Sequence, residues 1–115
     1  MKLEDQKCEA CRRDSPRVTN EEAYKLHKSL ENWDLIEDSG IEKLIKVFSF
    51  NGFMNAMKFA EQIAYISEEE GHHPQLVIDW GKTTVIWWTH KINGLHKNDF
   101  IMAARTDTLF GLTTK

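Results

Sequence analysis

A chain of 115 residues, of which 41% are hydrophobic and 29% charged, is long enough for one domain with its own core. The net charge of -3 at pH 7 argues against a strongly basic surface, so no direct nucleic-acid partner is expected. No stretch has the ~20 consecutive apolar residues that cross a bilayer, and the polar start lacks the apolar centre of a signal peptide. We therefore expect a cytoplasmic protein without a membrane partner.

Residues 1–18 are expected to form a polar arm before a single domain that spans residues 19–115. The arm holds the two cysteines of the chain, Cys8 and Cys11, at C-x-x-C spacing. A structural zinc site needs four ligands, and a redox C-x-x-C normally lies at the start of a helix that follows a strand. Reduced thiols without a chemical role are the favoured interpretation, and a metal or redox site shared between chains stays open.

The first expected helix covers residues 19–30. Thr19 and Glu22 have the spacing of a capping box, in which each side chain bonds the backbone N–H of the other residue. Residues 33–36 and 42–50 are then predicted as two strands around a turn-forming cluster. The second strand carries apolar side chains on both faces, so one face can meet helices and the other a second chain.

The clearest helix pattern begins at Phe53, after residues 51–52, which can cap it. Apolar side chains recur from there at i, i+3, i+4 and i+7 spacing. The helix should end near Gly71, because glycine suits the position just past a helix and the residue before Pro74 disfavours helical geometry. Two adjacent histidines, residues 72–73, are therefore expected on the connection that leaves this helix.

A second hairpin is predicted from residues 75–80 and 83–90, which are rich in β-branched and aromatic side chains. If it closes around the two-residue loop 81–82, His73 lies opposite His90. Directly opposed residues of antiparallel strands have Cβ atoms ~4.5 to 5.5 Å apart on one face. The hairpin is thus expected to bring His90 beside the histidine pair.

A last helix is predicted over residues 97–110, with Asp99 in its first turn, where the helix dipole favours a carboxylate. The order of elements predicts an α+β fold (α-β-β-α-β-β-α), with a four-stranded antiparallel sheet and three helices packed on one face. The long hydrophobic second helix and the aromatic-rich strands offer surface for symmetric self-association.

Four ionisable side chains are predicted to converge, namely those of His72, His73, His90 and Asp99. An imidazole has an unperturbed pKa of about 6.5, so it can give and take protons near neutral pH. The cluster suits general acid and base catalysis, in which a well placed group contributes ~10² to 10⁴ in rate.

Other interpretations of these residues stay open. Three histidines can hold a catalytic zinc ion, but adjacent residues of an extended segment point to opposite sides, so His72 and His73 are poorly set to share one ion. The histidines could instead only cap a helix and decorate a loop. Trp33, at the start of the first strand, could stack on a flat heterocycle, although core packing is the default for a large aromatic. No motif for nucleotide binding or acyl transfer is present.

One spaced pattern of residues stands out in the second half of the chain. It consists of an acidic residue, a histidine pair followed by proline, an aromatic residue, a further histidine and an aspartate. They are Glu68, His72, His73, Pro74, Trp80, His90 and Asp99. This pattern resembles that of the pterin-4a-carbinolamine dehydratases, and the resemblance covers about residues 8–105. The C-E-A-C segment of the arm is similar to bacterial members of the family.

The resemblance implies an enzyme that dehydrates 4a-hydroxytetrahydropterin to quinonoid dihydropterin and water. Such enzymes recycle the tetrahydropterin (tetrahydrobiopterin) cofactor of aromatic amino acid hydroxylases. The resemblance implies no metal and no organic cofactor. It also implies a homodimer or homotetramer, with a phenylalanine hydroxylase as a candidate partner.

Carried over residue by residue, the resemblance implies three catalytic histidines and four substrate-binding residues. The first set is His72, His73 and His90, and the second is Trp33, Glu68, Pro74 and Asp99. His72 and His90 are expected to transfer protons, and His73 mainly to orient the substrate. Which histidine is the acid stays open, and Glu68 either sets an imidazole tautomer or caps the helix. Animal relatives also bind a transcription factor, so a protein-interaction or regulatory module on the same fold is the alternative.

Overall fold

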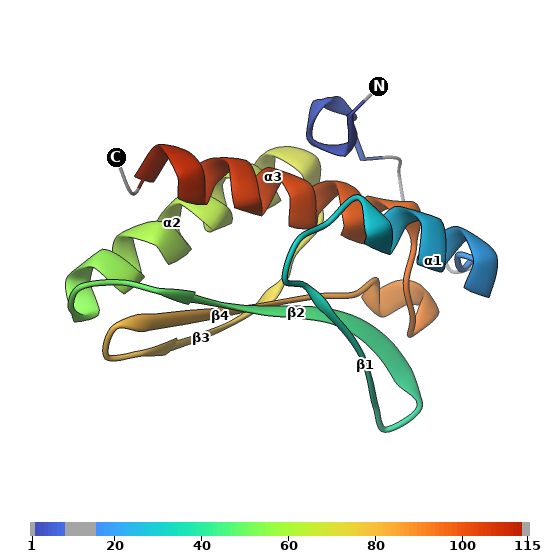
Figure 1. The fold of residues 1–115 in the computed structure, drawn as a ribbon, viewed down its shortest axis with the longest axis horizontal. Helices are drawn as coiled ribbons and strands as arrows, with labels where there is room; N and C mark the ends of the chain where they lie inside the picture. Colours follow the sequence, from blue (N-terminus) through green and yellow to red (C-terminus); the bar gives the residue numbers. More distant parts are fainter. Residues whose placement is uncertain (1, 9–15, 114–115) are drawn as a thin grey trace.

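The computed structural model describes residues 2–8 and 16–113, and the side chains of residues 2–8 and 16–112. The helices are α1 (Asn20–Lys28), α2 (Phe53–Glu70) and α3 (Lys97–Thr113), and the strands are β1 (Asp34–Asp38), β2 (Ile41–Ser49), β3 (Gln75–Asp79) and β4 (Lys82–Trp87). The strands form one antiparallel sheet in the order β1-β2-β4-β3, and the three helices cover one side of it (Figure 1). The predicted α+β fold is confirmed.

The start of α1 and the end of α2 are set by residues next to them in the chain, as predicted. The Thr19 hydroxyl accepts from the backbone N–H of Glu22 at 3.1 Å, and the Glu22 carboxylate accepts from that of Thr19 at 3.1 Å. The predicted capping box is therefore confirmed. Gly71 follows α2 in the left-handed conformation, with φ 63° and ψ 30°, which costs a residue with a Cβ more than it costs glycine. α2 thus ends where predicted, directly before the two adjacent histidines.

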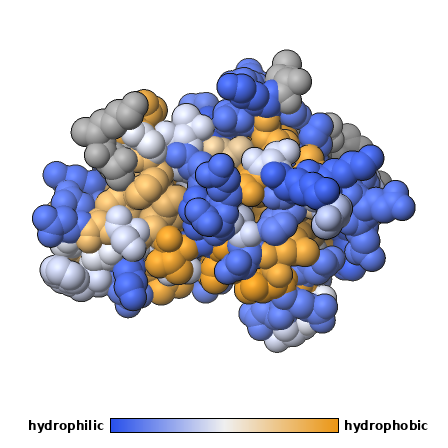
Figure 2. All heavy atoms as spheres, in the orientation of Figure 1, coloured by the Kyte–Doolittle hydropathy of each residue, from blue (hydrophilic) through white to orange (hydrophobic). Residues whose placement is uncertain are grey.

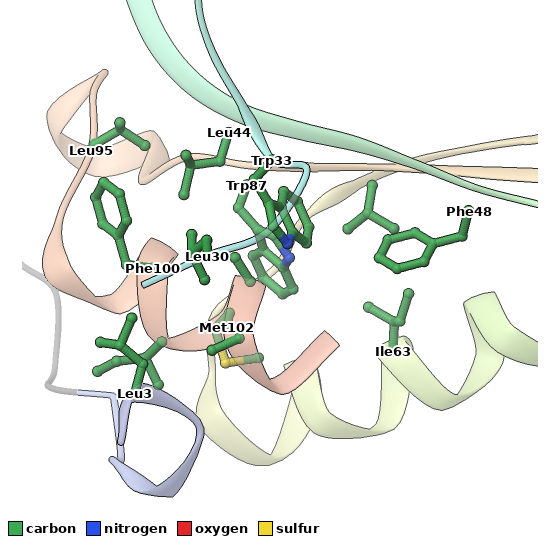
Figure 3. Packing of buried hydrophobic residues seen from close by; sticks show 14 of the residues in the cluster. Leu3, Leu30, Trp33, Leu44, Phe48, Ile63, Trp87, Leu95, Phe100 and Met102 are labelled. Carbon is green, nitrogen blue, oxygen red and sulfur yellow. The ribbon is translucent and has the colours of Figure 1, made fainter. Parts of the chain in front are cut away.

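The core fills the space between the helices and one face of the sheet (Figure 3). Its largest fully buried side chains come from β2, β4, α2 and α3 and include Phe48, Trp87, Phe59 and Phe100. The opposite face of the sheet is also apolar, because Ile45 of β2 lies beside Ile86 of β4 there. None of the described helices has the length and apolar character that crossing a membrane requires.

α2 carries a second apolar side that no described element covers. Phe53, Met54, Met57 and Tyr65 are 44%, 66%, 39% and 68% exposed. Figure 2 shows one face of the molecule, on which apolar patches lie between hydrophilic side chains. Exposed apolar side chains thus lie on α2, and self-association through them stays a prediction.

The second hairpin closes one residue earlier than predicted. Asp79 pairs with Lys82, so the loop consists of residues 80–81 and not of residues 81–82. Gly81 takes a φ of 73° at the second loop position, in the left-handed region that favours glycine. The glycine therefore ends the loop, whereas the prediction had placed it at the beginning.

This register changes how the histidines approach one another. Pairing between β3 and β4 ends at Gln75, so the predicted opposition of His73 and His90 is wrong. His90 instead begins η2 (His90–Ile92), a 3-10 turn that is closed by backbone hydrogen bonds between Thr89 and Gly94. The histidines meet through two connections at one end of the sheet and not through its ladder.

The described part of the N-terminal arm packs against the domain. The 3-10 turn η1 (Leu3–Asp5) contacts α3, and Leu3 is buried. The Cys8 backbone N–H donates to Glu70 Oε1 at 2.9 Å, near the end of α2. Cys11 lies outside the described residues, so the hypotheses for the C-x-x-C pair stay predictions.

Candidate active site

A cavity of about 230 Å³ opens at the end of the sheet, where α2 ends and η2 begins. Two segments line it: Gly71, His72 and His73 follow α2, and Thr89, His90 and Lys91 follow β4. The structure therefore brings the three histidines of the sequence motif around one cavity. A cavity of this size suits a small flat ring, since sites for drug-sized ligands run from ~300 to 1,000 Å³.

His72 is held by a buried carboxylate. Its Nε2 lies 2.6 Å from Asp99 Oδ1, and the two side chains are 8% and 0% exposed. The other oxygen of Asp99, Oδ2, accepts from the Thr89 hydroxyl at 2.8 Å and from the His96 backbone N–H at 2.9 Å. Because an ionised carboxylate only accepts hydrogen bonds, Nε2 of His72 carries a proton. In the neutral ring Nδ1 then carries no proton.

Two consecutive tryptophans at the end of β4 support two of the imidazoles. Trp87 is fully buried in the core, and Trp88, the next residue, is partly buried and packs against the core. His72 stacks on Trp87 with ring centroids 5.7 Å apart and planes at 5°. His90 stacks on Trp88 with ring centroids 4.3 Å apart and planes at 11°. Each imidazole plane is thus set by its own indole.

His90 is exposed on one side and covers the Trp88 indole on the other. This partial burial lowers the pKa of His90 below its ordinary value of 6.5. Positive charge on His72, Lys43 or His73 lowers the pKa further, while the Asp99 carboxylate acts in the opposite direction. The neutral imidazole is therefore the favoured form of His90 near neutral pH.

His73 lies on the solvent side of the cavity. Its side chain is 57% exposed, and its Nε2 lies 3.5 Å from Oε2 of Glu68, whose side chain is 80% exposed. An exposed pair of this kind contributes only ~0 to 1 kcal/mol and orders the ring weakly. Of the two roles considered for Glu68, this contact favours an effect on the imidazole. Pro74 is half-buried and does not line the cavity.

Trp33 lies among the buried side chains between the helices and the sheet (Figure 3). It is 2% exposed, and its Nε1–H donates to Asp107 Oδ2 at 3.0 Å. Its ring packs edge-on against Phe48, and it does not line the cavity. The arrangement gives no support to the expected stacking on a substrate, which stays a prediction.

Some residues around the site were missed in the sequence. Lys43 lies with its Nζ 4.1 Å from the Trp88 ring centroid. His96 directly precedes α3, and its Nδ1 accepts from the Asn98 backbone N–H at 3.0 Å. The i, i+3 spacing of His96 and Asp99 resembles that of a capping box, so the sequence could have indicated that His96 lies at the start of α3. Nothing local marks Lys43, because its contact depends on the pairing of β2 with β4.

The zinc hypothesis gains no geometric support. Within residues 2–8 and 16–113, no group of three or more His, Cys, Asp and Glu side chains is arranged to hold a metal ion. His72 directs Nε2 to Asp99, and His73 lies beside Glu68 at the exposed edge.

A model of the family described as pterin 4 alpha carbinolamine dehydratase matches residues 16–109. The chain belongs to this family. It is 54% identical over 108 residues to a Marinobacter nauticus protein named "Putative pterin-4-alpha-carbinolamine dehydratase", with 94% of this chain and 97% of the relative covered. A protein of the same name from Saccharophagus degradans is 48% identical over 108 residues, with 94% and 96% covered.

Solved structures related to this pterin carbinolamine dehydratase family share the fold. A transcriptional coactivator/pterin dehydratase from Brucella melitensis superposes with a TM-score of 0.75 at 28% identity, covering 84% of this chain and 100% of that one. A pterin dehydratase-like protein described as a RuBisCO assembly factor in the alpha-carboxysome gives a TM-score of 0.59 at 26% identity, covering 70% and 92%.

Proposed function

We propose that this protein dehydrates a 4a-hydroxytetrahydropterin to the quinonoid dihydropterin. The observation that carries the proposal is the cavity of about 230 Å³ that His72, His73 and His90 line together. Membership of the dehydratase family supports the pterin as substrate. A proton-transfer reaction needs fixed groups that titrate near neutral pH, and imidazoles meet that need.

The reaction breaks the C4a–O bond of the substrate. The departing hydroxyl takes a proton and leaves as water, while N5 loses its proton and its electron pair forms the new C=N bond. One group must therefore donate a proton and another must accept one, with no net change in protons. In our proposal His72 and His90 perform these two transfers, because stacking on an indole fixes each of their rings.

The other site residues have supporting roles in this proposal. His73, with Glu68 beside it, orients the pterin from the exposed edge of the cavity. Asp99 acts through His72, since its side chain is fully buried and its oxygens bond His72, Thr89 and the start of α3.

The physiological role that we propose is the recycling of tetrahydropterin for an aromatic amino acid hydroxylase, with a phenylalanine hydroxylase as the candidate partner. The proposal includes no metal and no organic cofactor, since the two proton transfers need neither. We further propose a homodimer or homotetramer in the cytoplasm. The exposed apolar side of α2 and the open face of the sheet support self-association.

The test is turnover of enzymatically generated 4a-hydroxytetrahydropterin by the wild type and by His72→Gln and His90→Gln. We expect each variant to lose ~10² to 10⁴ in kcat, the usual contribution of one acid or base group. His27→Gln is the matched control, because His27 on α1 contacts the Trp33 carbonyl and does not line the cavity. Folded His72 and His90 variants that both keep the full rate would end the proposal.

A second candidate function is a protein-interaction or regulatory module. The exposed apolar side of α2 favours it, as do the printed descriptions of the two solved relatives as a coactivator and as an assembly factor. Met54→Glu on α2 discriminates the two functions. Loss of assembly or of partner binding with intact turnover would place the interaction surface on α2, and absence of turnover in the wild type would favour the module.

A further inference from the structure

Three side chains form a cluster just beyond the end of β4: those of Lys43, Trp88 and His90. The Lys43 ammonium lies 4.1 Å from the Trp88 ring centroid, and the His90 ring stacks on the same indole at 4.3 Å. Neither Lys43 nor Trp88 lines the cavity, whereas His90 does. The contact of these two residues with the cavity therefore runs through His90.

Lys43 is an unusually well held lysine. Its side chain is only 11% exposed, and its Nζ forms an ion pair with Asp38 Oδ2 at 3.1 Å across the first hairpin. A cation over an indole is attracted by the negative face of the ring, and more strongly when it is shielded from water. The ammonium therefore stays on the indole and does not extend into solvent.

The cluster bears on His90 in two ways. The near-parallel indole, at 11°, restricts the plane of a ring that solvent would otherwise leave free to rotate. In addition, protonation of His90 would place a second cation on an indole that already carries the Lys43 ammonium, which like-charge repulsion disfavours.

We propose that Trp88 and Lys43 are positioning residues for His90, with Trp88 fixing the plane of the imidazole and Lys43 favouring its neutral form. The catalytic consequence rests on the function proposed above, but the effect on the imidazole does not. An active site that must exchange a proton at a set position benefits from both effects.

Other ionisable groups around His90 act on the same ring. They are His72 and His73 on the connection after α2 and Asp99 on α3. Lys91, beside His90 in η2, lines the same cavity. Burial is the largest cause of the lowered pKa of His90, followed by His72, and Lys43 contributes in the same direction. Removing the Lys43 charge should thus raise the pKa of His90 without returning it fully to an exposed histidine's value.

The first experiment follows the imidazole itself by histidine ¹⁵N NMR across pH, with the His90 signals assigned from the His90→Gln spectrum. Lys43→Met keeps the length of the side chain and removes its charge, and we expect the titration midpoint of His90 to rise. Trp88→Leu removes the indole, and the ring-current shift of the His90 ring protons should disappear. An unchanged midpoint in the first variant together with unchanged shifts in the second would overturn the proposal.

Lys46→Met is the matched control. Lys46 also pairs with a carboxylate, Asp107 at 2.8 Å, and lies 4.9 Å from the Phe48 ring centroid, but it does not line the cavity or contact Trp88. Its replacement removes the same kinds of contact from the same strand. We expect it to leave the His90 midpoint where it is in the wild type, so a shift as large as that of Lys43→Met would contradict a specific role for Lys43.

The second experiment is the pH profile of turnover. In Lys43→Met, the limb of the pH profile that reports His90 ionisation should move to higher pH. In Trp88→Leu, kcat should fall about tenfold, because the imidazole is no longer held. Trp88→Phe should recover most of that loss. If the wild type shows no turnover, the proposed function fails while the NMR result still decides the positioning role. If the enzyme turns over and neither Lys43→Met nor Trp88→Leu changes the pH profile or kcat, the positioning role is refuted and the proposed function stands.

Discussion

The imidazole of His72 and the carboxylate of Asp99 are joined at 2.6 Å, Nε2 to Oδ1, with the carboxylate fully buried. Asp99→Asn keeps the shape and removes the charge that orients His72. We expect kcat to fall by about 10², the lower end of the effect of one misplaced acid or base group. The free energy of unfolding should fall by about 2 kcal/mol, because hydrogen bonds to a charged acceptor contribute ~1.5 to 3 kcal/mol each. Steady-state kinetics and urea unfolding measure the two effects.

Asp107→Asn provides the comparison for Asp99→Asn on the same helix. Asp107 accepts from the Trp33 indole and pairs with Lys46, so its loss should lower stability and leave kcat unchanged. Equal losses of kcat in both variants at equal stability would show that Asp99 has only a structural role.

The lowered pKa of His90 makes stability depend on pH in a stated direction. The unfolded chain takes up the His90 proton near pH 6.5, whereas the folded protein takes it up only at lower pH. The unfolded state therefore binds more protons just below pH 6.5, so stability falls as pH drops from 6.5 towards the folded pKa. His90→Gln lacks this contribution. Urea unfolding of both proteins over this range should show the wild type losing stability faster, and parallel curves would contradict the prediction.

Trp33 offers a direct test between core packing and substrate stacking. In Trp33→Phe the hydrogen bond to Asp107 is lost and the ring becomes smaller, so we expect the free energy of unfolding to fall by about 1 to 3 kcal/mol. KM for the pterin should not change, because Trp33 does not line the cavity. A rise in KM several times larger than that of the Asp107→Asn variant would restore Trp33 as a substrate-binding residue.

Gly71 links the end of α2 to His72, the first of the histidines that we propose as catalytic. Its φ of 63° is left-handed, and a Cβ there would meet no atom within 4 Å, so Gly71→Ala strains only the backbone. We expect a loss of about 1 kcal/mol in stability and a larger relative loss in kcat, since His72 must shift with the strained turn. Gly71→Asn should be milder in both respects, because asparagine tolerates this conformation better. Thermal unfolding and kinetics on the two variants compare them, and an alanine variant as active as the wild type would show that the turn does not set the position of His72.

Features of the fold that depend on neighbouring residues were predictable from the sequence. The capping box at Thr19 and the end of α2 at Gly71 both follow from chemistry within four residues, and each was found where expected. The hairpin around Gly81 was predicted, but its register was not, because a two-residue loop can place a single glycine first or second. The sequence motif identified the histidines of the site. The predicted hairpin register did not, because it placed His90 opposite His73.

Contacts that join distant segments were beyond the sequence. Trp33 is buried, and its indole nitrogen donates to Asp107 of α3. No residue near Trp33 in the chain indicates that partner. The cluster of Lys43 with Trp88 likewise requires β2 and β4 to be neighbours in the sheet order. Periodicity identifies the strands, but it does not say which of them are adjacent.

Trp87 and Trp88 are joined by one peptide unit, and each carries one of the two imidazoles on its ring. The two indoles that support the imidazoles are therefore held at a separation that one stretch of backbone sets. We therefore expect a preorganised site, in which a pterin binds without rearrangement of these rings. Free and ligand-bound forms should superimpose closely here, and turnover should not wait for a closing movement of the protein.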